Sequence, residues 1–313
     1  MAQCLICEHK DFTQISNRIR EGEGRITQCD YCGLVIQDLG WDADRLTDYY
    51  HSEYQSTNSL VTGQVQSPEQ RFNDKLPTMQ PVFDRVRPLL QPGHRVLEVG
   101  CGSGELLWLI KPHIARCVGV DLYPPFVQFM QEKLSIESYA EDINRLAFDE
   151  TFDVVICVST LEHLSNPLET LLTMKNLLSP SGKVYVEVPN SNEALNFFLP
   201  TANQQKFKEF FWHRAHLFYF TEETIGALFK KAGMQVQITC RHEYTLKNFL
   251  NWYFLGRPQP SFKMGVLETQ LFSGNSDFEV KMNNMFAAME MEFKSILAET
   301  LRGDTLCCIG WVP

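Results

Sequence analysis

The chain has 313 residues, of which 44% are hydrophobic and 21% are charged, so we expect a folded globular protein of about two domains. No apolar run approaches the ~20 residues needed to cross a bilayer, and the first residues lack the apolar stretch of a secretory signal. A net charge of −10 argues against a globally basic surface for nucleic acid. Ten cysteines without a secretion signal favour a reducing, cytoplasmic compartment over a disulfide scaffold.

Four cysteines near the N-terminus form two C-x-x-C pairs, Cys4 with Cys7 and Cys29 with Cys32. Two such pairs let four thiolates converge tetrahedrally on a structural zinc ion. Strand-like segments at 25–29 and 33–37 complete the pattern of a small zinc ribbon, which we place at residues 1–45. A redox dithiol or buried cysteines without a ligand are the alternatives.

Residues 46–92 are expected to form a linker and a helical lead-in. A polar, tyrosine-rich stretch from Trp41 to about Ser67 comes first. A helix over 69–90 follows, and we expect its prolines to interrupt it.

From residue 93, short apolar runs alternate with amphipathic stretches, a pattern that predicts an α/β domain with a parallel sheet covered on both faces. The predicted strands are 95–100, 117–122, 152–159, 182–190 and 234–240, and the predicted helices are 105–111, 125–133, 167–178 and 221–232. Thr221 is the natural N-cap of the last helix, but Thr224 stands where a capping box needs Glu or Gln. This domain spans 93–243, a helical cap insertion spans 244–303, and 304–313 forms one more strand.

The strand at 95–100 runs into the glycine turn Gly100–Gly104 and then into a helix. Such a turn lets the backbone approach a ligand closely, and Asp121 at the end of the next strand suits two ribose hydroxyls. Glu105 replaces the third glycine of a dinucleotide site, and Glu98 favours a ligand with a positively charged amine over a pyrophosphate. A nicotinamide or flavin site and an ordinary tight turn remain the alternatives.

Further segments follow at matching intervals: VGVDLYP (118–124), AEDINRLAF (140–148), FDVVICVSTLEHLSNP (152–167) and GKVYVEVPN (182–190). Over about 90–240 and the last strand, the chain resembles class I S-adenosylmethionine-dependent methyltransferases. The resemblance implies a Rossmann-like, mostly parallel seven-stranded sheet with an antiparallel final strand. It implies S-adenosylmethionine, with S-adenosylhomocysteine as product, held by Glu98, Gly100, Gly102, Gly104, Asp121, Leu122, Asp142 and Ile143. Asp142 as a helix cap and Glu98 as a cap of the glycine-turn amides are the structural alternatives.

Methyl transfer to an alcohol, or to a carbon beside a ketone, also needs a base, and histidine suits that task at neutral pH. His163 follows the fourth strand of the domain, at the edge where the ligand crevice of an α/β sheet lies. His216 lies with the weaker candidate His213 in the aromatic segment 210–221, which we expect to cover the same crevice. A capping or supporting role for His163 and a backbone-bonded core role for His216 are the alternatives.

The ribbon, the Glu-His-Leu after the fourth strand and the segment 216–221 together resemble a bacterial group that includes sugar C-methyltransferases. The resemblance implies a small-molecule acceptor, a sugar or sugar conjugate, with His163 or His216 as the general base. Ala215 and His213 depart from that group's Tyr-x-Glu-His segment, which makes O-methylation at least as well supported as C-methylation. A tyrosine of the stretch at 48–58 would reach the site, with Tyr54 preferred to Tyr49 and Tyr50, unless these residues only pack between modules.

Two other functions stay open. One is an RNA methyltransferase that grips RNA with the ribbon, which the net charge disfavours, and the other is a non-catalytic scaffold that retains the cofactor fold. Neither a nucleic acid nor a membrane is the expected partner. Met and Phe at helical spacing in the insertion predict a core-facing stripe, with a substrate lid or a subunit surface as alternatives.

Overall fold

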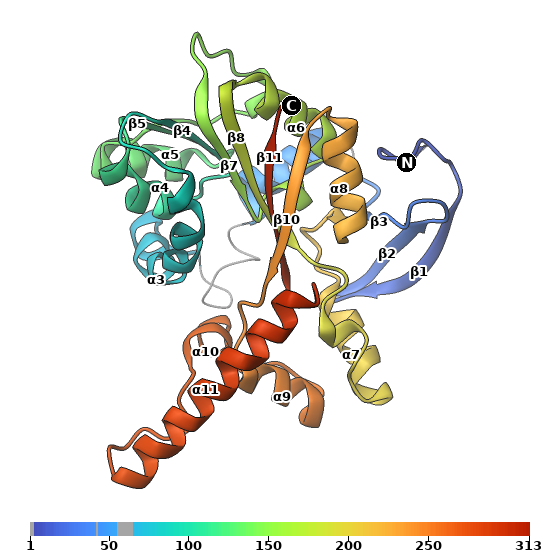
Figure 1. Cartoon of the computed structure of the whole chain (residues 1–313). Helices are drawn as coiled ribbons and strands as arrows, with labels where there is room; N and C mark the ends of the chain where they lie inside the picture. Colours follow the sequence, from blue (N-terminus) through green and yellow to red (C-terminus); the bar gives the residue numbers. More distant parts are fainter. Residues whose placement is uncertain (1–2, 42, 55–64) are drawn as a thin grey trace.

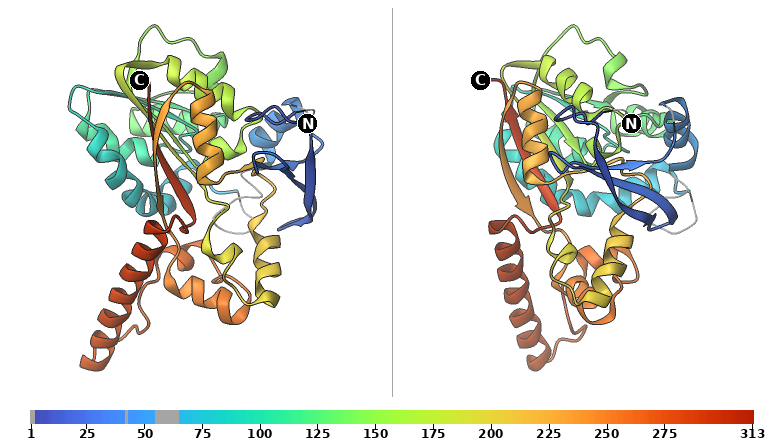
Figure 2. Two further views of the ribbon diagram at one scale, coloured as in Figure 1. Left: turned by 45° about the vertical axis from the view of Figure 1, so that its right-hand side comes forward. Right: turned by 90° about the vertical axis from the view of Figure 1, so that its right-hand side faces the viewer.

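The computed structural model describes residues 3–41, 43–54 and 65–313 (Figure 1). Within these ranges the strands form one sheet of seven strands and one of four. Helices cover the larger sheet, and the smaller sheet lies beside it, as the second view in Figure 2 makes plain. No described helix is long and apolar enough to span a membrane.

The larger sheet confirms the expected Rossmann-like architecture. The pairs β7–β8, β4–β7, β4–β5 and β5–β6 are parallel, and β11 is antiparallel to both of its neighbours. The sequence pattern missed only the three-residue strand β6, of which a single side chain is buried. In spatial order the strands are β10 (Gln235–Arg241), β11 (Thr305–Trp311), β8 (Leu178–Pro189), β7 (Phe152–Val158), β4 (Arg95–Val99), β5 (Arg116–Val120) and β6 (Glu137–Tyr139).

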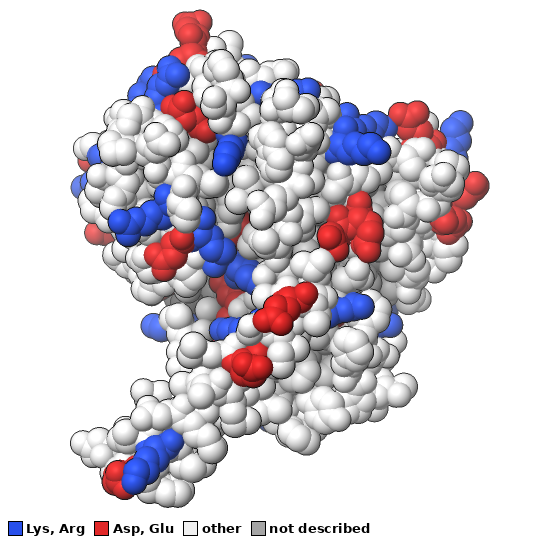
Figure 3. All heavy atoms as spheres, in the orientation of Figure 1, with Lys and Arg blue, Asp and Glu red and all other residues white. Residues whose placement is uncertain are grey.

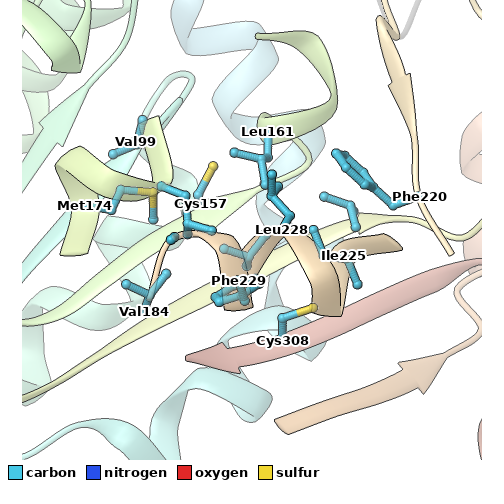
Figure 4. Packing of buried hydrophobic residues seen from close by; sticks show 14 of the residues in the cluster. Val99, Cys157, Leu161, Met174, Val184, Phe220, Ile225, Leu228, Phe229 and Cys308 are labelled. Carbon is cyan, nitrogen blue, oxygen red and sulfur yellow. The ribbon is translucent and has the colours of Figure 1, made fainter. Parts of the chain in front are cut away.

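Alternating side chains of the central strands pack against helices on opposite faces, because successive residues of a strand point to opposite sides. Val96 of β4 packs against the helices on one face, while Leu97 joins the core on the other. The first face carries α3 (Pro68–Val86) and α4 (Glu105–Ile110), and the second carries α6 (Pro167–Asn176) and α8 (Glu222–Lys231). Figure 4 shows the second core, where Met174, Leu228 and Cys157 point toward one another.

Helix α3 corrects one expectation, because it runs unbroken through Pro77 and Pro81. Packing of its buried face, which includes Val82 and Phe83, stabilises the helix despite the two missing N–H donors. Helix α8 begins at the predicted N-cap, Thr221, and here the Thr224 hydroxyl completes the capping box by accepting from the Thr221 N–H at 2.8 Å. Thr224 therefore completes the capping box, a role for which we expected Glu or Gln.

The smaller sheet is antiparallel and joins the N-terminal ribbon to the methyltransferase-like domain. Its strands are β1 (Phe12–Ile19), β2 (Gly22–Cys29), β3 (Val35–Asp38) and β9 (Phe218–Tyr219). Since β9 lies just before α8, the ribbon is completed by a strand from the distant part of the chain. The ribbon residues Leu34 and Ile36 are fully buried in the main core.

The expected helical insertion lies between β10 and β11 and comprises α9 (Leu246–Leu255), α10 (Phe262–Leu267) and α11 (Asp277–Glu299). Figures 1 and 2 show α11 extending away from the sheet. The expected core-facing stripe on α11 is wrong for three of its four methionines, since Met285, Met289 and Met291 are 49–75% exposed. Because α11 projects from the body of the protein, only part of its length can pack against other elements.

The remaining helices and helical turns are short and connect the larger elements. They are α1 (Ala43–Asp48), α5 (Pro124–Phe129), α7 (Thr201–Phe211) and turns at Tyr49–Glu53, Arg87–Leu89, Lys111–His113, Met130–Leu134, Ile143–Arg145, Leu161–His163 and Ala194–Asn196.

Candidate active site

The carboxyl ends of β4, β5 and β7 open onto a cavity of about 680 Å³. Helix α3 and the loop before β9 line its other sides. Of the residues expected to hold the cofactor, the cavity is lined by Glu98, Gly100, Gly102, Asp121, Leu122, Asp142 and Ile143. The candidate catalytic residues His163, His216 and Tyr54 line the same cavity, so one space contains both sets.

The glycine turn needs its glycines for two reasons. Gly100, Gly102 and Gly104 all have positive φ, at 73°, 57° and 89°, a region that other residues rarely adopt. A β-carbon at Gly100 would collide with the Thr160 side chain, and one at Gly104 would lie 2.7 Å from the Met130 sulfur. Gly104, which does not line the cavity, is the N-cap of α4 and packs against the core.

Two carboxyl groups border this turn, the buried Glu98 and the half-buried Asp121. Glu98 is 4% exposed, and its Oε2 atom has no hydrogen-bond partner. Burial, and then the nearby Glu105 carboxylate, raise the pKa of Glu98 well above its ordinary range. The Asp121 carboxylate accepts hydrogen bonds from the N–H groups of Gly102 at 2.8 Å and Tyr123 at 2.9 Å, and burial raises its pKa against these two donors. Glu98 fits the ammonium group of a ligand that the cavity could hold.

Asp142 caps a turn and also lines the cavity. Its Oδ1 atom accepts a hydrogen bond from the Asn144 N–H at 2.9 Å and so caps the turn that begins at Ile143. It lines the cavity at the same time, beside the buried Ile143 side chain.

The sequence analysis missed two cationic residues of the cavity, Arg71 and Lys75, which lie one turn apart on α3. The Arg71 Nε atom is buried without a hydrogen-bond partner, and its guanidinium lies 5.1 Å from the centre of the Phe126 ring. Burial lowers the pKa of Lys75, and the positive charge of the nearby Arg71 lowers it further. In the sequence, the spacing of four residues indicates that Arg71 and Lys75 lie on the same face of a helix. Only the packing of α3 shows that this face meets the glycine turn.

Across the cavity, three side chains form what we call the Glu162–His163–His216 corner. A ligand atom from each residue lies within 4.8 Å of the other two, and Glu162 Oε1 is 3.8 Å from His163 Nε2. The rings of His163 and His216 have centres 4.8 Å apart. Glu162 is 1% exposed, and both of its carboxylate oxygens lack hydrogen-bond partners.

A backbone carbonyl fixes the orientation of His163. The Ala215 oxygen lies 2.9 Å from His163 Nδ1, and because a carbonyl can only accept, Nδ1 carries the proton and Nε2 presents its lone pair to the corner. Burial lowers the pKa of His163 to about 4 and raises the pKa of Glu162 to about 8. The neutral imidazole is therefore the dominant form at neutral pH.

The tyrosine-rich segment reaches the corner as expected. Tyr54 lines the cavity, and its ring centre is 5.8 Å from that of His163. Tyr50 also lines the cavity and makes polar contacts with His163. The Tyr50 hydroxyl is 3.1 Å from both His163 Nδ1 and the Ala215 carbonyl oxygen. His213 does not line the cavity, and its Nε2 atom lies 3.4 Å from Glu21.

The ribbon holds the segment that carries His216. The Gln37 backbone N–H donates to the Leu217 oxygen at 2.9 Å, and its side-chain amide donates to the Arg214 oxygen at 2.8 Å. From the turn between β1 and β2, the Arg20 N–H donates to the Trp212 oxygen at 2.7 Å. The four-stranded sheet therefore supports one wall of the cavity.

The four ribbon cysteines converge as their spacing predicts. The Sγ atoms of Cys4 and Cys32 are 3.5 Å apart, and so are those of Cys7 and Cys29. Tetrahedral thiolates at ~2.3 Å from zinc lie roughly 3.8 Å from one another, so the cluster fits this ion. All four donors are sulfur, and four protein ligands leave no open position for a substrate.

The chain matches a family model described as a methyltransferase domain over residues 69–237, which is more than half of its length. Ubiquinone biosynthesis O-methyltransferase of Coxiella burnetii is 32% identical over 106 residues, covering 32% of this chain and 45% of that protein. Its counterpart in Xanthomonas campestris is 30% identical over 110 residues, covering 33% and 46%. The chain thus spans less than half the length of these relatives.

The chain is also similar to solved structures. An S-adenosylmethionine-dependent methyltransferase from Archaeoglobus fulgidus is 18% identical with a TM-score of 0.49, covering 77% of this chain and 96% of that one. Magnesium protoporphyrin IX methyltransferase from Synechocystis, solved with bound S-adenosylhomocysteine, is 20% identical with a TM-score of 0.47, covering 64% and 93%. On the match to the family model, which covers more than half of its length, the chain belongs to the methyltransferase-domain family.

Proposed function

We propose that the protein transfers a methyl group from S-adenosylmethionine to a hydroxyl oxygen of a small polar acceptor, with a sugar or sugar conjugate as the favoured class. The observation that carries this proposal is the single cavity that joins the glycine turn to the Glu162–His163–His216 corner. Methyl transfer is a displacement at carbon, and holding both reactants in one enclosed space supplies much of its rate. The relatives named as O-methyltransferases support oxygen over carbon as the methylated atom.

Different residues of the chain would bind different parts of the cofactor. S-adenosylmethionine supplies an electrophilic methyl group on a sulfonium. Asp121 would accept hydrogen bonds from the ribose hydroxyls, and Asp142 would accept from the adenine amine with Ile143 and Leu122 beside the ring. Glu98 would pair with the ammonium group of the methionine part, and Arg71 and Lys75 supply the positive charge that its carboxylate needs.

The acceptor hydroxyl would lie at the corner and lose its proton there. His163 is the better placed base, because the Ala215 carbonyl holds its proton on Nδ1 and leaves Nε2 as the acceptor. His216 stands beside it as the second candidate, and Tyr50 and Tyr54 would position the acceptor. Buried aromatic rings and polar groups in one wall suit a sugar, which presents both apolar and hydroxyl surfaces.

We also propose that the four ribbon cysteines hold zinc with a structural role, since about 40 residues bury too little apolar area to fold alone. An RNA substrate is the second candidate function, and the net charge of −10 disfavours it. On the face drawn in Figure 3, Lys and Arg lie among Asp and Glu.

Calorimetry with S-adenosylhomocysteine tests the cofactor half of the proposal. We expect micromolar binding to the wild type and at least about 100-fold weaker binding by Asp121→Ala, since two hydrogen bonds to a charged group are lost. Glu141→Ala, at an exposed position on the same wall, is the matched control and should bind normally. Failure of the wild type to bind would refute the proposal.

Incubation with methyl-labelled cofactor tests the acceptor half. Small hydroxylated metabolites, including sugars and sugar nucleotides, are offered as a fractionated extract, and mass spectrometry identifies the molecule that gains the label. We expect a hydroxylated small molecule to be labelled, and the label to disappear with His163→Ala. Label found in RNA instead would favour the second candidate.

A further inference from the structure

The Glu162–His163–His216 corner contains more unused binding capacity than a base and its acceptor require. Glu162 is the clearest case, because a carboxyl group buried without hydrogen bonds has lost its contacts with water and needs another group to replace them. Within the described ranges, the one cation-forming side chain within 4.0 Å of its carboxyl group is His163, at 3.8 Å, and that imidazole is neutral at neutral pH. The His216 Nδ1 atom is buried without a partner as well.

We propose that this corner binds a divalent transition-metal ion, with Glu162, His163 and His216 as its three protein ligands. Two imidazole nitrogens and one carboxylate oxygen form a donor set used by catalytic zinc and by non-haem iron sites. The ligand atoms now lie within 4.8 Å of one another, whereas zinc ligands at ~2.1 Å from the ion are about 3.4 Å apart. Side-chain rotations that move each group by about 1 Å would close the difference.

The surroundings of His163 match those of a metal ligand. A ligating histidine donates its other ring N–H to a carboxylate or backbone carbonyl, which fixes its tautomer and orientation. Here His163 Nδ1 makes that hydrogen bond to the Ala215 carbonyl at 2.9 Å, and Nε2 faces the corner. The carbonyl belongs to the residue before His216, so the same loop would both orient one ligand and supply another.

The number of ligands and the cavity predict the type of site. Three protein ligands leave at least one coordination position open, and the corner lines the cavity, so a small molecule can reach that position. This distinguishes the corner from the ribbon, where four thiolates close the coordination shell. The inference rests on the proposed function and changes one part of it. A bound ion would lower the pKa of an acceptor hydroxyl that coordinates it, so the hydroxyl would release its proton to solvent water instead of to a histidine.

Titration with Co²⁺ tests the inference on the full-length protein after its ribbon has been saturated with zinc. We expect one further equivalent to bind, with weak visible bands and without the intense near-ultraviolet charge-transfer band that thiolate ligands would give. Glu162→Gln and His216→Ala should each weaken this binding by at least about 100-fold, because each removes a ligand. Glu169→Gln, an exposed carboxylate on the same cavity, and His113→Ala, an exposed histidine away from it, should bind Co²⁺ normally.

S-adenosylhomocysteine calorimetry on the same variants separates this inference from the proposed function. Normal binding of S-adenosylhomocysteine shows that each variant is folded and that the cofactor half is intact. The inference is overturned if the zinc-saturated wild type takes up no Co²⁺ at 1 mM, or if Glu162→Gln and His216→Ala retain the wild-type affinity. In either case the methyltransferase proposal would stand, with His163 as the base.

Discussion

The contact between the ribbon and the histidine-bearing loop can be tested with one isosteric change, Gln37→Met. Gln37 is 2% exposed on β3, and its side-chain amide donates to the Arg214 oxygen at 2.8 Å. Methionine has a similar length and volume, so the substitution removes the polar contacts while largely preserving the packing. The Arg214 carbonyl is then left without this donor.

The expected cost follows from those contacts. A buried carbonyl that loses its donor costs about 1–3 kcal/mol, and the lower part of this range applies because the hydrogen bond to the Arg214 oxygen is only part-buried. The 3.5 Å contact from the Tyr219 hydroxyl to Gln37 Oε1 adds little because it is long. We expect about 1–2 kcal/mol, which corresponds to a roughly 5- to 30-fold higher population of the open loop. The backbone hydrogen bond from Gln37 to the Leu217 oxygen remains, so the loop should loosen and the fold should persist.

Two measurements check this value. Urea unfolding should show the loss in stability. Hydrogen exchange at the Leu217 backbone amide, which donates to the backbone carbonyl oxygen of Glu162, should accelerate. Gln28→Met is the matched control, because Gln28 is exposed on the same ribbon and bonds only within it, to the Gly33 oxygen; its effect should stay within ~0.5 kcal/mol. A Gln37→Met protein with wild-type stability and wild-type exchange would refute the idea that the ribbon supports the loop.

Three further changes address the cofactor turn, the sheet and the ribbon. Gly100→Ala should weaken S-adenosylhomocysteine binding at least tenfold by calorimetry, because the added methyl meets Thr160 at a positive φ. Glu187→Gln should cost about 3–5 kcal/mol in urea unfolding by removing the buried carboxylate that pairs with both Arg85 and Arg241, against at most ~1 kcal/mol for the exposed Glu137→Gln. Burial raises the pKa of Glu187, but its two arginines lower the pKa by more, so the net pKa is depressed. The ionised Glu187 therefore stabilises the fold above about pH 4.5, and this stabilisation is lost as the pH falls through the lowered pKa. The same pH-dependent loss of stability should be absent from Glu187→Gln. Removing metal from the four-cysteine cluster with a chelator should abolish amide protection in β2 and β3 while the seven-stranded sheet stays protected.

Features that depend on local sequence were predictable. The glycine turn could be read directly, because residues 100, 102 and 104 need a positive φ that glycine alone adopts easily. The cysteine pairs were equally clear, since their spacing matches the geometry of a metal ligand set. Thr221 gave the start of α8 for the same kind of reason, a side chain that serves its own backbone.

Features that depend on distant packing were not predictable. Gln37 looks like any polar strand residue until the fold places Arg214, 177 residues away, against it. Arg71 and Lys75 belong to the cavity only because α3 packs on β4, and Pro77 and Pro81 stay helical for the same reason. Glu162 stood in a motif that the sequence analysis quoted, but its complete burial without partners became visible only in three dimensions.

The pairing of β3 with β9 has a consequence for synthesis of the chain. The β2–β3 hairpin is synthesised before β9, the strand that covers the edge of β3 and follows it about 180 residues later in the chain. At several residues per second, the edge would stay open for roughly ten seconds or more, a time in which unpaired N–H and C=O groups can capture a foreign strand. A nascent chain stalled before β9 should therefore be more prone to aggregation than one released just beyond it.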